Sequence, residues 1–357
     1  MTISAQDRRR RIVATVRETG PIRVVQLAER LGMPAVTVRR DIAALAAEGV
    51  LERTHGAVAL PDQGPPGSAV SAAGRTIGVL VPAAGQYFGE VVAGVRTVAE
   101  TAGARLVLGI APYGADSGRT QARRLVESGA HGLLLVPDWS PDSGLAGEDW
   151  LGELPVPTVL VERRGDLGSA AAGLDSVCSD HRHGVYLALR RLAGLGHGAV
   201  LLAARSDTRT AYEVRAGYAE AVGRLGLTAP PVVDVPNEDN PAAAGGPEAV
   251  ADAIARAAAS GVRAALVHND RDALALLPLL RDRGLTVPGD LALIAYDDLY
   301  ASLADPPLTA VAPPKQAVGA EALRLLLRRF EAGDALPVHR LDLLPALIVR
   351  RSCGEGA

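Results

Sequence analysis

The feature that most limits the fold of this chain is an alternation that begins at Thr76, where short apolar runs are separated by longer amphipathic stretches. The runs are TIGVLVP, ARLVLGIA, GLLLVP, PTVLVE, AVLLAA, AALVHN and LALIAYDD. The amphipathic stretches cover residues 88–102, 117–128, 181–195, 212–225, 271–283 and 315–332. Continuous Val, Leu and Ile runs joined by helices are typical of parallel strands buried on both faces. The pattern predicts an α/β fold with two wound lobes of about 140 residues each.

The first sixty residues follow a different pattern. Apolar residues recur at helical spacing over 5–19, 24–31 and 35–48, and a short turn joins the second stretch to the third. Residues 51–60 then alternate apolar and polar side chains around a glycine, as in a small hairpin. The spacing predicts three helices arranged as a helix-turn-helix and followed by a wing. The chain as a whole is therefore expected to be a multidomain protein.

Charge is distributed unevenly along the chain, although the net charge is only −3. Residues 1–60 contain ten Arg and six Asp or Glu, a net charge of +4, whereas the remainder carries −7. A basic segment attached to an acidic body predicts that the basic segment alone meets a polyanion such as nucleic acid.

Residues 26–60 read QLAERLGMPAVTVRRDIAALAAEGVLERTHGAVAL. This segment resembles the DeoR-type winged helix-turn-helix and meets nearly every position of that family's pattern. The resemblance implies that the third helix enters the major groove of DNA, where Arg binds guanine and Thr meets a base edge or a phosphate. The residues that it nominates for DNA binding are Thr37, Arg39, Arg40 and, in the wing, His55.

Some points around this motif stay open. The alternative for Arg39 and Arg40 is a solvated helix face without DNA contact. Asp41 belongs to the motif, but phosphates would repel its carboxylate, so we expect it to hold Arg40 or brace the wing. The wing carries Ala57 where the family more often has a second glycine, which limits backbone freedom at that position.

Residues 61–75, PDQGPPGSAVSAAGR, lack apolar periodicity and are rich in Pro, Gly and Ser. Such a segment is typical of an extended, semi-flexible linker. It lacks a leucine that could wedge into the minor groove, so kinking of DNA by this segment is not expected. The predicted domains are therefore 1–60, which binds DNA, the linker 61–75, and 76–357, which binds an effector and dimerises.

Motifs between Ile77 and about Arg351 follow, in order, those of the sensor domain of LacI/GalR-type repressors, a domain similar to periplasmic sugar-binding proteins. The most specific stretch is ALVHNDRDALALLPLLRDRGLTVPGDLALIAYDDLYASLADPPLTAV, and YFGEVVAGVRTVAETAG and LGHGAVLLAA also match. The resemblance implies a periplasmic-binding-protein-like domain whose chain crosses between the lobes near 177–180, 312–314 and 343–345. The helix after the second crossing then belongs to the first lobe.

Ligands of such folds bind outside the carboxyl ends of the strands. By resemblance, the residues that face this cleft are Tyr87, Phe88, Glu162, Asn269, Asp270 and Asp297. The two aromatic rings would stack on a sugar or a base, while the amide and the carboxylates would bind hydroxyl or amine groups. Glu162 stands where the family usually has Asp.

The family's ligand-binding Arg is replaced here by Val214. Arg209 and Arg215 are the candidates to supply the missing guanidinium. Structural alternatives stay open for several positions: Phe88 as a core residue, Asp270 as a helix cap, Asp297 as the end of a strand, and Arg215 on a solvated helix face.

Other classes of site find little support. Cys178 and Cys353 lie far apart, which signals neither a disulfide framework nor a zinc site. His181 and His183 would not share a face of a helix, so no metal is expected there, and no cofactor is expected elsewhere. No motif of nucleotide-binding or hydrolytic enzymes is found. No apolar stretch reaches the length of a membrane span, and we expect a cytoplasmic protein without a membrane partner.

These observations predict a sequence-specific transcription regulator, a repressor whose affinity for operator DNA is controlled by a sugar, polyol or nucleoside. We expect a homodimer that places two DNA-binding domains on a palindromic operator. The alternative function is a cytoplasmic small-molecule binding protein, or a phosphosugar-related enzyme, with an accessory DNA-binding domain.

Overall fold

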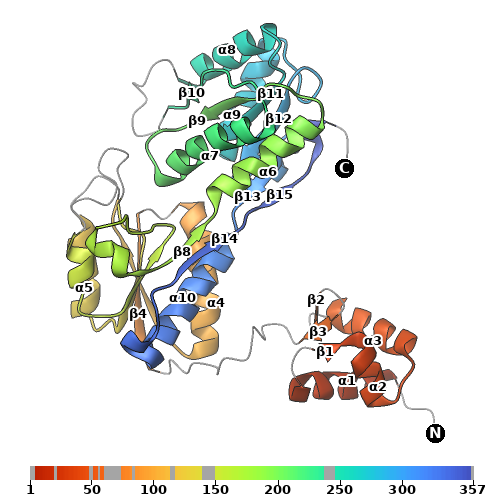
Figure 1. Ribbon diagram of the computed structural model, residues 1–357, viewed down its shortest axis with the longest axis vertical. Coiled ribbons are helices and arrows are strands. Elements are labelled where there is room, and N and C mark those ends of the chain that lie inside the picture. Colours follow the sequence, from red (N-terminus) through yellow and green to blue (C-terminus); the bar gives the residue numbers. More distant parts are fainter. Residues whose placement is uncertain are drawn as a thin grey trace. The chain divides into compact units, whose positions relative to one another are not determined.

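The computed structural model describes residues 5–19, 22–47, 51–54, 57–59, 74–82, 85–112, 117–138, 149–236 and 246–354. The chain divides into two compact units, an N-terminal unit (Met1–Ala69) and a C-terminal unit (Val70–Ala357). Figure 1 shows both with their helices and strands labelled. Most of the predicted linker, residues 61–73, lies outside the described residues.

The N-terminal unit contains the three predicted helices and the hairpin. They are α1 (Ala5–Thr19), α2 (Val24–Leu31), α3 (Ala35–Ala47), and the strands β1 (Ile22–Arg23), β2 (Glu52–Thr54) and β3 (Ala57–Ala59). The strands form an antiparallel sheet in the order β1-β3-β2. The helical spacing of apolar residues explains the packing, because Ile12, Leu27, Val38 and Ile42 from the three helices are fully buried in one core.

The first lobe of the C-terminal unit is a parallel six-stranded sheet with helices on both faces. Its strands are, in spatial order, β14 (Arg340–Leu343), β8 (Asp175–Ser179), β7 (Thr158–Val161), β6 (Gly132–Leu135), β4 (Thr76–Val81) and β5 (Arg105–Ile110). Helices α4 (Gln86–Ala102) and α10 (Lys315–Ala332) share one core with the sheet, and α5 (Ser117–Glu127) packs in a second core.

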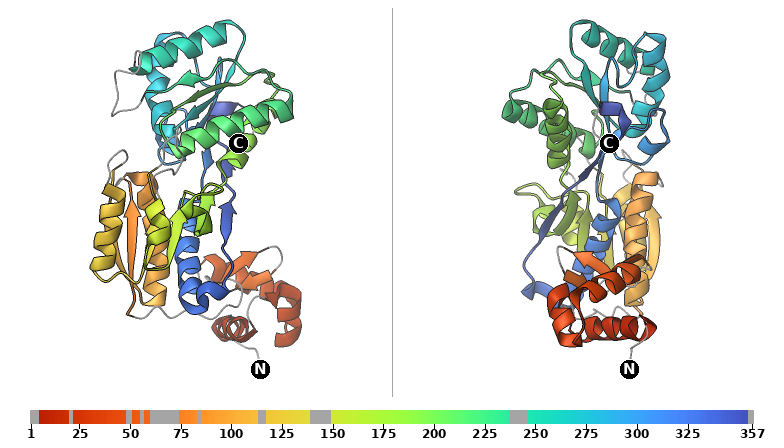
Figure 2. Two further views of the ribbon diagram at one scale, coloured as in Figure 1. Left: turned by 60° about the vertical axis from the view of Figure 1, so that its left-hand side comes forward. Right: turned by 90° about the vertical axis from the view of Figure 1, so that its right-hand side faces the viewer.

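The second lobe repeats this plan. Its sheet runs β10 (Val233–Asp234), β9 (Leu201–Ala204), β11 (Ala264–His268), β12 (Ala292–Tyr296), β13 (Thr309–Ala312) and β15 (Ala346–Ile348), and only β15 is antiparallel to its neighbour. Helices α6 (His181–Gly194) and α7 (Arg209–Leu225) pack in one core. Helices α8 (Gly246–Ala259) and α9 (Asp270–Asp282) pack in the other (Figure 2). The predicted fold class is confirmed.

The chain passes between the two lobes three times. It leaves the first sheet after β8 and enters α6, returns from β13 to α10, and leaves again between β14 and β15. These passages coincide with the crossings expected near 177–180, 312–314 and 343–345. Because α10 follows the second crossing, the end of the second lobe's sheet and the first turn of a first-lobe helix are neighbours in sequence.

Helices α4 and α10 approach each other closely through two glycines. A Cβ atom placed on Gly94 would lie 1.9 Å from the carbonyl oxygen of Gln316, and one on Gly319 would lie 1.9 Å from that of Val91. Only glycine permits this backbone contact, which holds the start of α10 against the first lobe.

We therefore expect Gly319→Ala to lower the free energy of unfolding by about 1 to 3 kcal/mol, because a methyl group there must push two helix backbones apart. The measurement is chemical denaturation of the full chain. Gly89→Ala is the matched control, because no atom lies within 4 Å of a Cβ at that position on α4. A Gly319→Ala variant as stable as the parent would show that the helices separate at no cost.

Candidate functional sites

The third helix of the N-terminal unit presents its basic side chains to solvent. Arg39 and Arg40 on α3 are exposed and Thr37 is half-buried, whereas Val38 on the opposite face is fully buried. The helix is thus anchored by its apolar face and leaves the basic face available. His55 lies outside the described residues, so its role stays a prediction.

Asp41 is held by helix α1. Its carboxylate is 3% exposed, accepts a hydrogen bond of 2.9 Å from Arg8 Nε, and lies 3.7 Å from Arg9 Nε. These partners differ from Arg40, one of the two expectations for Asp41, and the other, bracing of the wing, stays a prediction. The ion pair fixes α3 against α1, so Asp41 sets the orientation of the helix that carries Arg39.

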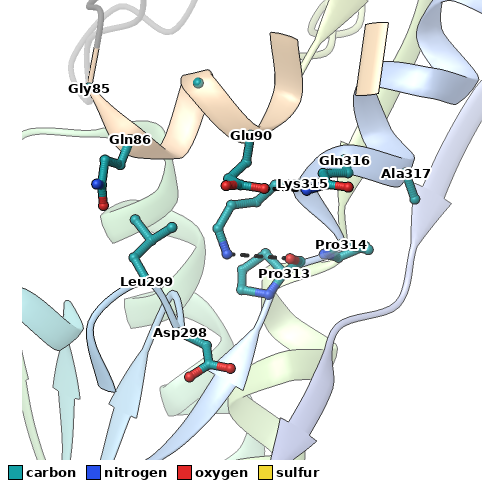
Figure 3. A pocket seen from close by; sticks show the side chains of 11 residues that line it. Gly85, Gln86, Glu90, Asp298, Leu299, Pro313, Pro314, Lys315, Gln316 and Ala317 are labelled. Atoms are coloured by element: carbon teal, nitrogen blue, oxygen red, sulfur yellow. Dashed lines mark hydrogen bonds between the residues drawn. The ribbon is translucent and has the colours of Figure 1, made fainter. Parts of the chain in front are cut away.

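A pocket of about 730 Å³ lies in the C-terminal unit where the second crossing meets the first lobe (Figure 3). It is formed by the start of α4, the loop after β12, the crossing itself and the start of α10. Its lining residues are Gly85, Gln86, Gly89, Glu90, Asp298, Leu299, Pro313, Pro314, Lys315, Gln316 and Ala317. Both lobes therefore contribute to its walls.

Lys315 is the only lysine of the chain and forms part of this pocket. Its side chain is 7% exposed, donates to the carbonyl oxygens of Asp297 and Pro313, and places Nζ 5.5 Å from the centre of the Tyr87 ring. Lys315 begins α10 of the first lobe, whereas Asp297 follows β12 of the second. The ammonium group thus joins the two lobes at the pocket.

Glu162 at the end of β7 is occupied by groups of the protein. Its carboxylate accepts from the Tyr87 hydroxyl at 2.8 Å, and from the backbone N–H and the hydroxyl of Ser179 at 2.9 and 2.8 Å. The expectation was that Glu162 would accept from ligand hydroxyls. The longer side chain instead ties the first turn of α4 to the strand that leads into the first crossing.

The aromatic pair at the start of α4 also makes contacts within the protein. The rings of Tyr87 and Phe88 lie 5.3 Å apart in an edge-to-face arrangement, and both side chains pack against the first-lobe core. Burial raises the pKa of Tyr87 well above its usual value, and the neighbouring carboxylates of Glu162 and Asp297 add to that shift. Tyr87 therefore stays a neutral hydroxyl donor.

The two arginine candidates are both paired inside the second lobe. Arg209 lies 2.5 Å from Glu213, and Arg215 donates to the carbonyl oxygen of Arg205 at 2.7 Å and to Asp234 at 2.5 Å. Val214, which replaces the expected arginine, is fully buried in the core. Arg215 is thus bonded to a strand end rather than displayed on a solvated helix face.

Asn269 and Asp270 stabilise local structure. Asn269 is the N-cap of α9 and forms a capping box with Asp272. Asp270 is 1% exposed, and one of its oxygens accepts from three successive backbone N–H groups, those of Leu299, Tyr300 and Ala301. The residue that caps the helix is therefore Asn269, while Asp270 fastens the loop that follows β12.

Asp297 differs from the other carboxylates. It is 7% exposed, adopts a φ of +92°, and its Oδ1 atom has no hydrogen-bond partner among the described residues. Burial raises the pKa of Asp297 to about 7, with Asp270 and Glu162 adding to the shift and Lys315 opposing it. A buried acceptor without a partner is rare in folded proteins and is a candidate ligand contact.

His181, the first residue of α6, belongs to a polar contact between the lobes. His181 Nδ1 lies 3.1 Å from the Tyr296 hydroxyl, and His181 Nε2 lies 3.8 Å from Glu162. Burial lowers the pKa of His181. Within the described ranges, no group of three or more His, Cys, Asp or Glu side chains is placed to hold a metal ion.

Comparison with known proteins supports two modules. Residues 8–64 match the model of the DeoR-like helix-turn-helix domain, and residues 189–353 match that of the periplasmic binding protein-like domain. The HTH-type transcriptional repressor PurR of Vibrio atlanticus is 29% identical over 272 residues, which cover 73% of this chain and 76% of the relative. The arabinose metabolism transcriptional repressor of Geobacillus stearothermophilus is 23% identical over 341 residues, 92% and 90% of the two chains.

Solved structures give the same picture. A complex of the transcriptional regulator CelR with cellobiose is 26% identical, with a TM-score of 0.64, and the match covers 89% of this chain and 90% of that one. The lac repressor dimer bound to operator and an anti-inducer has a TM-score of 0.65 at 22% identity, which covers 78% and 94%. At this identity, the similarity to the lac repressor shows that the two chains share a fold.

The fold, the basic helix and the relatives together define a DNA-binding transcription regulator. The chain carries a DeoR-like helix-turn-helix domain joined to a periplasmic-binding-protein-like domain of the kind found in LacI/GalR-type repressors. The relatives named above are regulators, not enzymes. Among the described residues, no helix combines the length and apolar character needed to cross a membrane.

Sequence reasoning missed several residues of the pocket. Gln86, Glu90, Lys315 and Gln316 all line it, and Gln316 donates to Glu90 at 2.5 Å across the two helices. The available signal was Lys315, since a single lysine in a chain with 37 Lys and Arg is a compositional exception.

The pKa of Asp297 makes stability depend on pH. Because the folded value, about 7, lies above the ordinary 3.8, the folded state keeps a proton that the unfolded state loses, and the stability contributed by neutral Asp297 is lost as pH rises toward 7. We expect Asp297→Asn to gain stability relative to the parent by about 1 kcal/mol or more between about pH 5 and about pH 8. Denaturation curves at the two pH values measure it. A constant difference between the proteins would contradict a buried, protonated carboxyl group.

Proposed function

We propose that this protein is a cytoplasmic repressor whose affinity for operator DNA is controlled by a small effector bound between the lobes of the C-terminal unit. The observation that supports this most is Asp297, a buried carboxylate with an unpartnered oxygen next to a pocket that both lobes form. The CelR–cellobiose complex among the similar structures supports a sugar as the effector.

The mechanism follows from the position of Lys315. An effector that hydrogen-bonds to Asp297 acts on the same residue whose carbonyl oxygen receives the Lys315 ammonium group. A change in that contact alters how α10 of the first lobe meets the end of β12. Because only a differential affinity for two conformations can shift their populations, we expect a coupling of about 1 to 3 kcal/mol between effector and operator binding.

The test measures operator binding by fluorescence anisotropy, on a DNA fragment selected from random sequence, with and without sugars, polyols and nucleosides. Arg39→Ala should weaken specific binding by about tenfold or more, since a base contact is lost. Asp297→Ala should bind operator normally but lose the response to effector.

Arg11→Ala is the matched control, because it removes one exposed positive charge from α1 of the same unit. Its loss of affinity should be smaller and independent of DNA sequence. A normal effector response in Asp297→Ala would show that the effector binds elsewhere.

We further propose that the protein acts as a homodimer through the edge of the first lobe. Strand β5 ends that sheet, and its Leu108 and Ile110 side chains are 52% and 42% exposed. Beside it lies an apolar groove of about 340 Å³, in which Arg96 and Glu100 stand one helical turn apart on α4. A two-fold axis brings opposite charges of two copies together, as a self-complementary interface requires.

On this proposal, Leu108→Glu places a charge in the interface and shifts the protein from dimer to monomer in sedimentation velocity. Operator affinity should fall by about tenfold or more, because binding through two linked heads is lost. Leu303→Glu, at a 76% exposed leucine of the second lobe, is the control. A Leu108→Glu variant that sediments as the parent does would place any self-association on another surface.

A further inference from the structure

Two buried side chains of the C-terminal unit, a histidine and an aspartate, each have one polar atom without a hydrogen-bond partner among the described residues. Apart from guanidinium nitrogens, the buried side-chain nitrogen and oxygen atoms that lack a hydrogen-bond partner among the described residues are His268 Nδ1 and Asp297 Oδ1. The two side chains are 3% and 7% exposed. Buried polar atoms are nearly always paired, so a chain that leaves two unpaired at one place needs a reason.

Both atoms belong to the same edge of the second sheet. His268 is the last residue of β11, and Asp297 directly follows the last residue of β12. These strands are parallel neighbours, with Val267 opposite Ala295 (Figure 1). The carboxyl edge of a parallel sheet in a doubly wound fold is where ligands bind, so the two unpaired groups lie at the place where a ligand can satisfy them.

The surroundings of His268 keep it neutral. Burial lowers its pKa to about 3, with His181 and then Arg205 adding to the shift. The ring packs edge-on against Tyr296, with 5.6 Å between ring centres. A neutral imidazole donates one hydrogen bond and accepts one, so a hydroxyl group, which can do both, is a fitting partner for either ring nitrogen.

The cations near this edge are already engaged, two of them by carboxylates and the third by backbone oxygens. Arg205 donates to Asp207 at 3.0 and 2.6 Å, and Arg215 pairs with Asp234 at 2.5 Å. Lys315 donates to backbone carbonyl oxygens. A phosphate or carboxylate placed here would meet Asp297 and Glu162 and would have to break one of these pairs to find a positive partner, which costs free energy.

We infer that His268 is a specificity-determining residue of the effector site, acting with Asp297, and that the effector is an uncharged hydroxyl-bearing molecule rather than a phosphorylated one. This inference rests on the proposed function, because it assumes that an effector binds between the lobes. It goes beyond that function in two ways: it adds His268, the residue before Asn269 and Asp270, to the site, and it says that the ligand carries no charge. His268 accepts or donates one hydroxyl hydrogen bond, and Asp297 takes a second.

The experiment uses the full chain and matched pairs of probes: ribose and ribose 5-phosphate, glucose and glucose 6-phosphate, adenosine and adenosine 5′-monophosphate, together with cellobiose. Thermal unfolding identifies the compounds that bind, since a ligand of the folded state raises the midpoint. Titration calorimetry then measures their dissociation constants. An uncharged compound should bind, and its phosphorylated counterpart should bind about tenfold or more weakly.

The variants are His268→Ala, His268→Gln and Asp297→Ala. His268→Ala should weaken binding of the uncharged probe by about tenfold, because it deletes one hydrogen bond, whereas the amide of His268→Gln should restore part of the affinity. The matched control is His197→Ala, since His197 precedes β9 and so lies at the opposite edge of the same sheet. This control should bind as the parent does.

The binding of the variants distinguishes a failure of the role of His268 from a failure of the effector site as a whole. If Asp297→Ala loses binding and His268→Ala does not, the role of His268 is wrong while the effector pocket stands. If neither variant loses binding, both proposals are wrong. A preference for the phosphorylated member of any pair, or no binding by any uncharged probe, overturns the charge class.

Discussion

The contact on which the arrangement of the C-terminal unit depends is the bond from the Lys315 ammonium group to the backbone oxygen of Asp297. It lies where the chain returns from the second lobe to the first, and it gives a buried ammonium group a backbone partner, with the carbonyl oxygen of Pro313 as a second. A buried charge without such partners would be costly, so these bonds make the burial of Lys315 tolerable. Because α10 packs closely on α4, the position of Lys315 is fixed relative to the first-lobe core.

Most polar residues around the cleft serve the protein itself. Glu162 holds Tyr87 and Ser179, Asp270 holds the loop after β12, and Asn269 caps α9. These bonds pre-organise the site, because side chains that are already fixed lose little entropy when a ligand arrives. Ligand recognition then depends on the few polar groups that remain unpaired. Because these groups are held rigidly, they discriminate among ligands better than flexible side chains would.

The sequence predicted the fold far better than the site. Apolar periodicity and motif order depend on local spacing, and they located α3, α10 and the three crossings. The partners of a polar side chain depend on residues far away in the chain: Glu162 bonds to Tyr87, 75 positions earlier, and Asp41 bonds to Arg8, 33 positions earlier. His268 was missed because a histidine at the end of an apolar run is indistinguishable from a core residue until its neighbours are known.

The order of the strands has a consequence for synthesis of the chain. Helix α10 and strand β14 complete the first lobe, yet they follow α6 to β13, all of the second lobe except β15, in sequence. A ribosome therefore releases β4 to β8 long before the helix that covers them, and their apolar face waits for the second lobe to be made. Such a delayed closure exposes hydrophobic surface and favours aggregation of the nascent chain. Chain connectivity is therefore a source of aggregation risk that is separate from the stability of the finished protein.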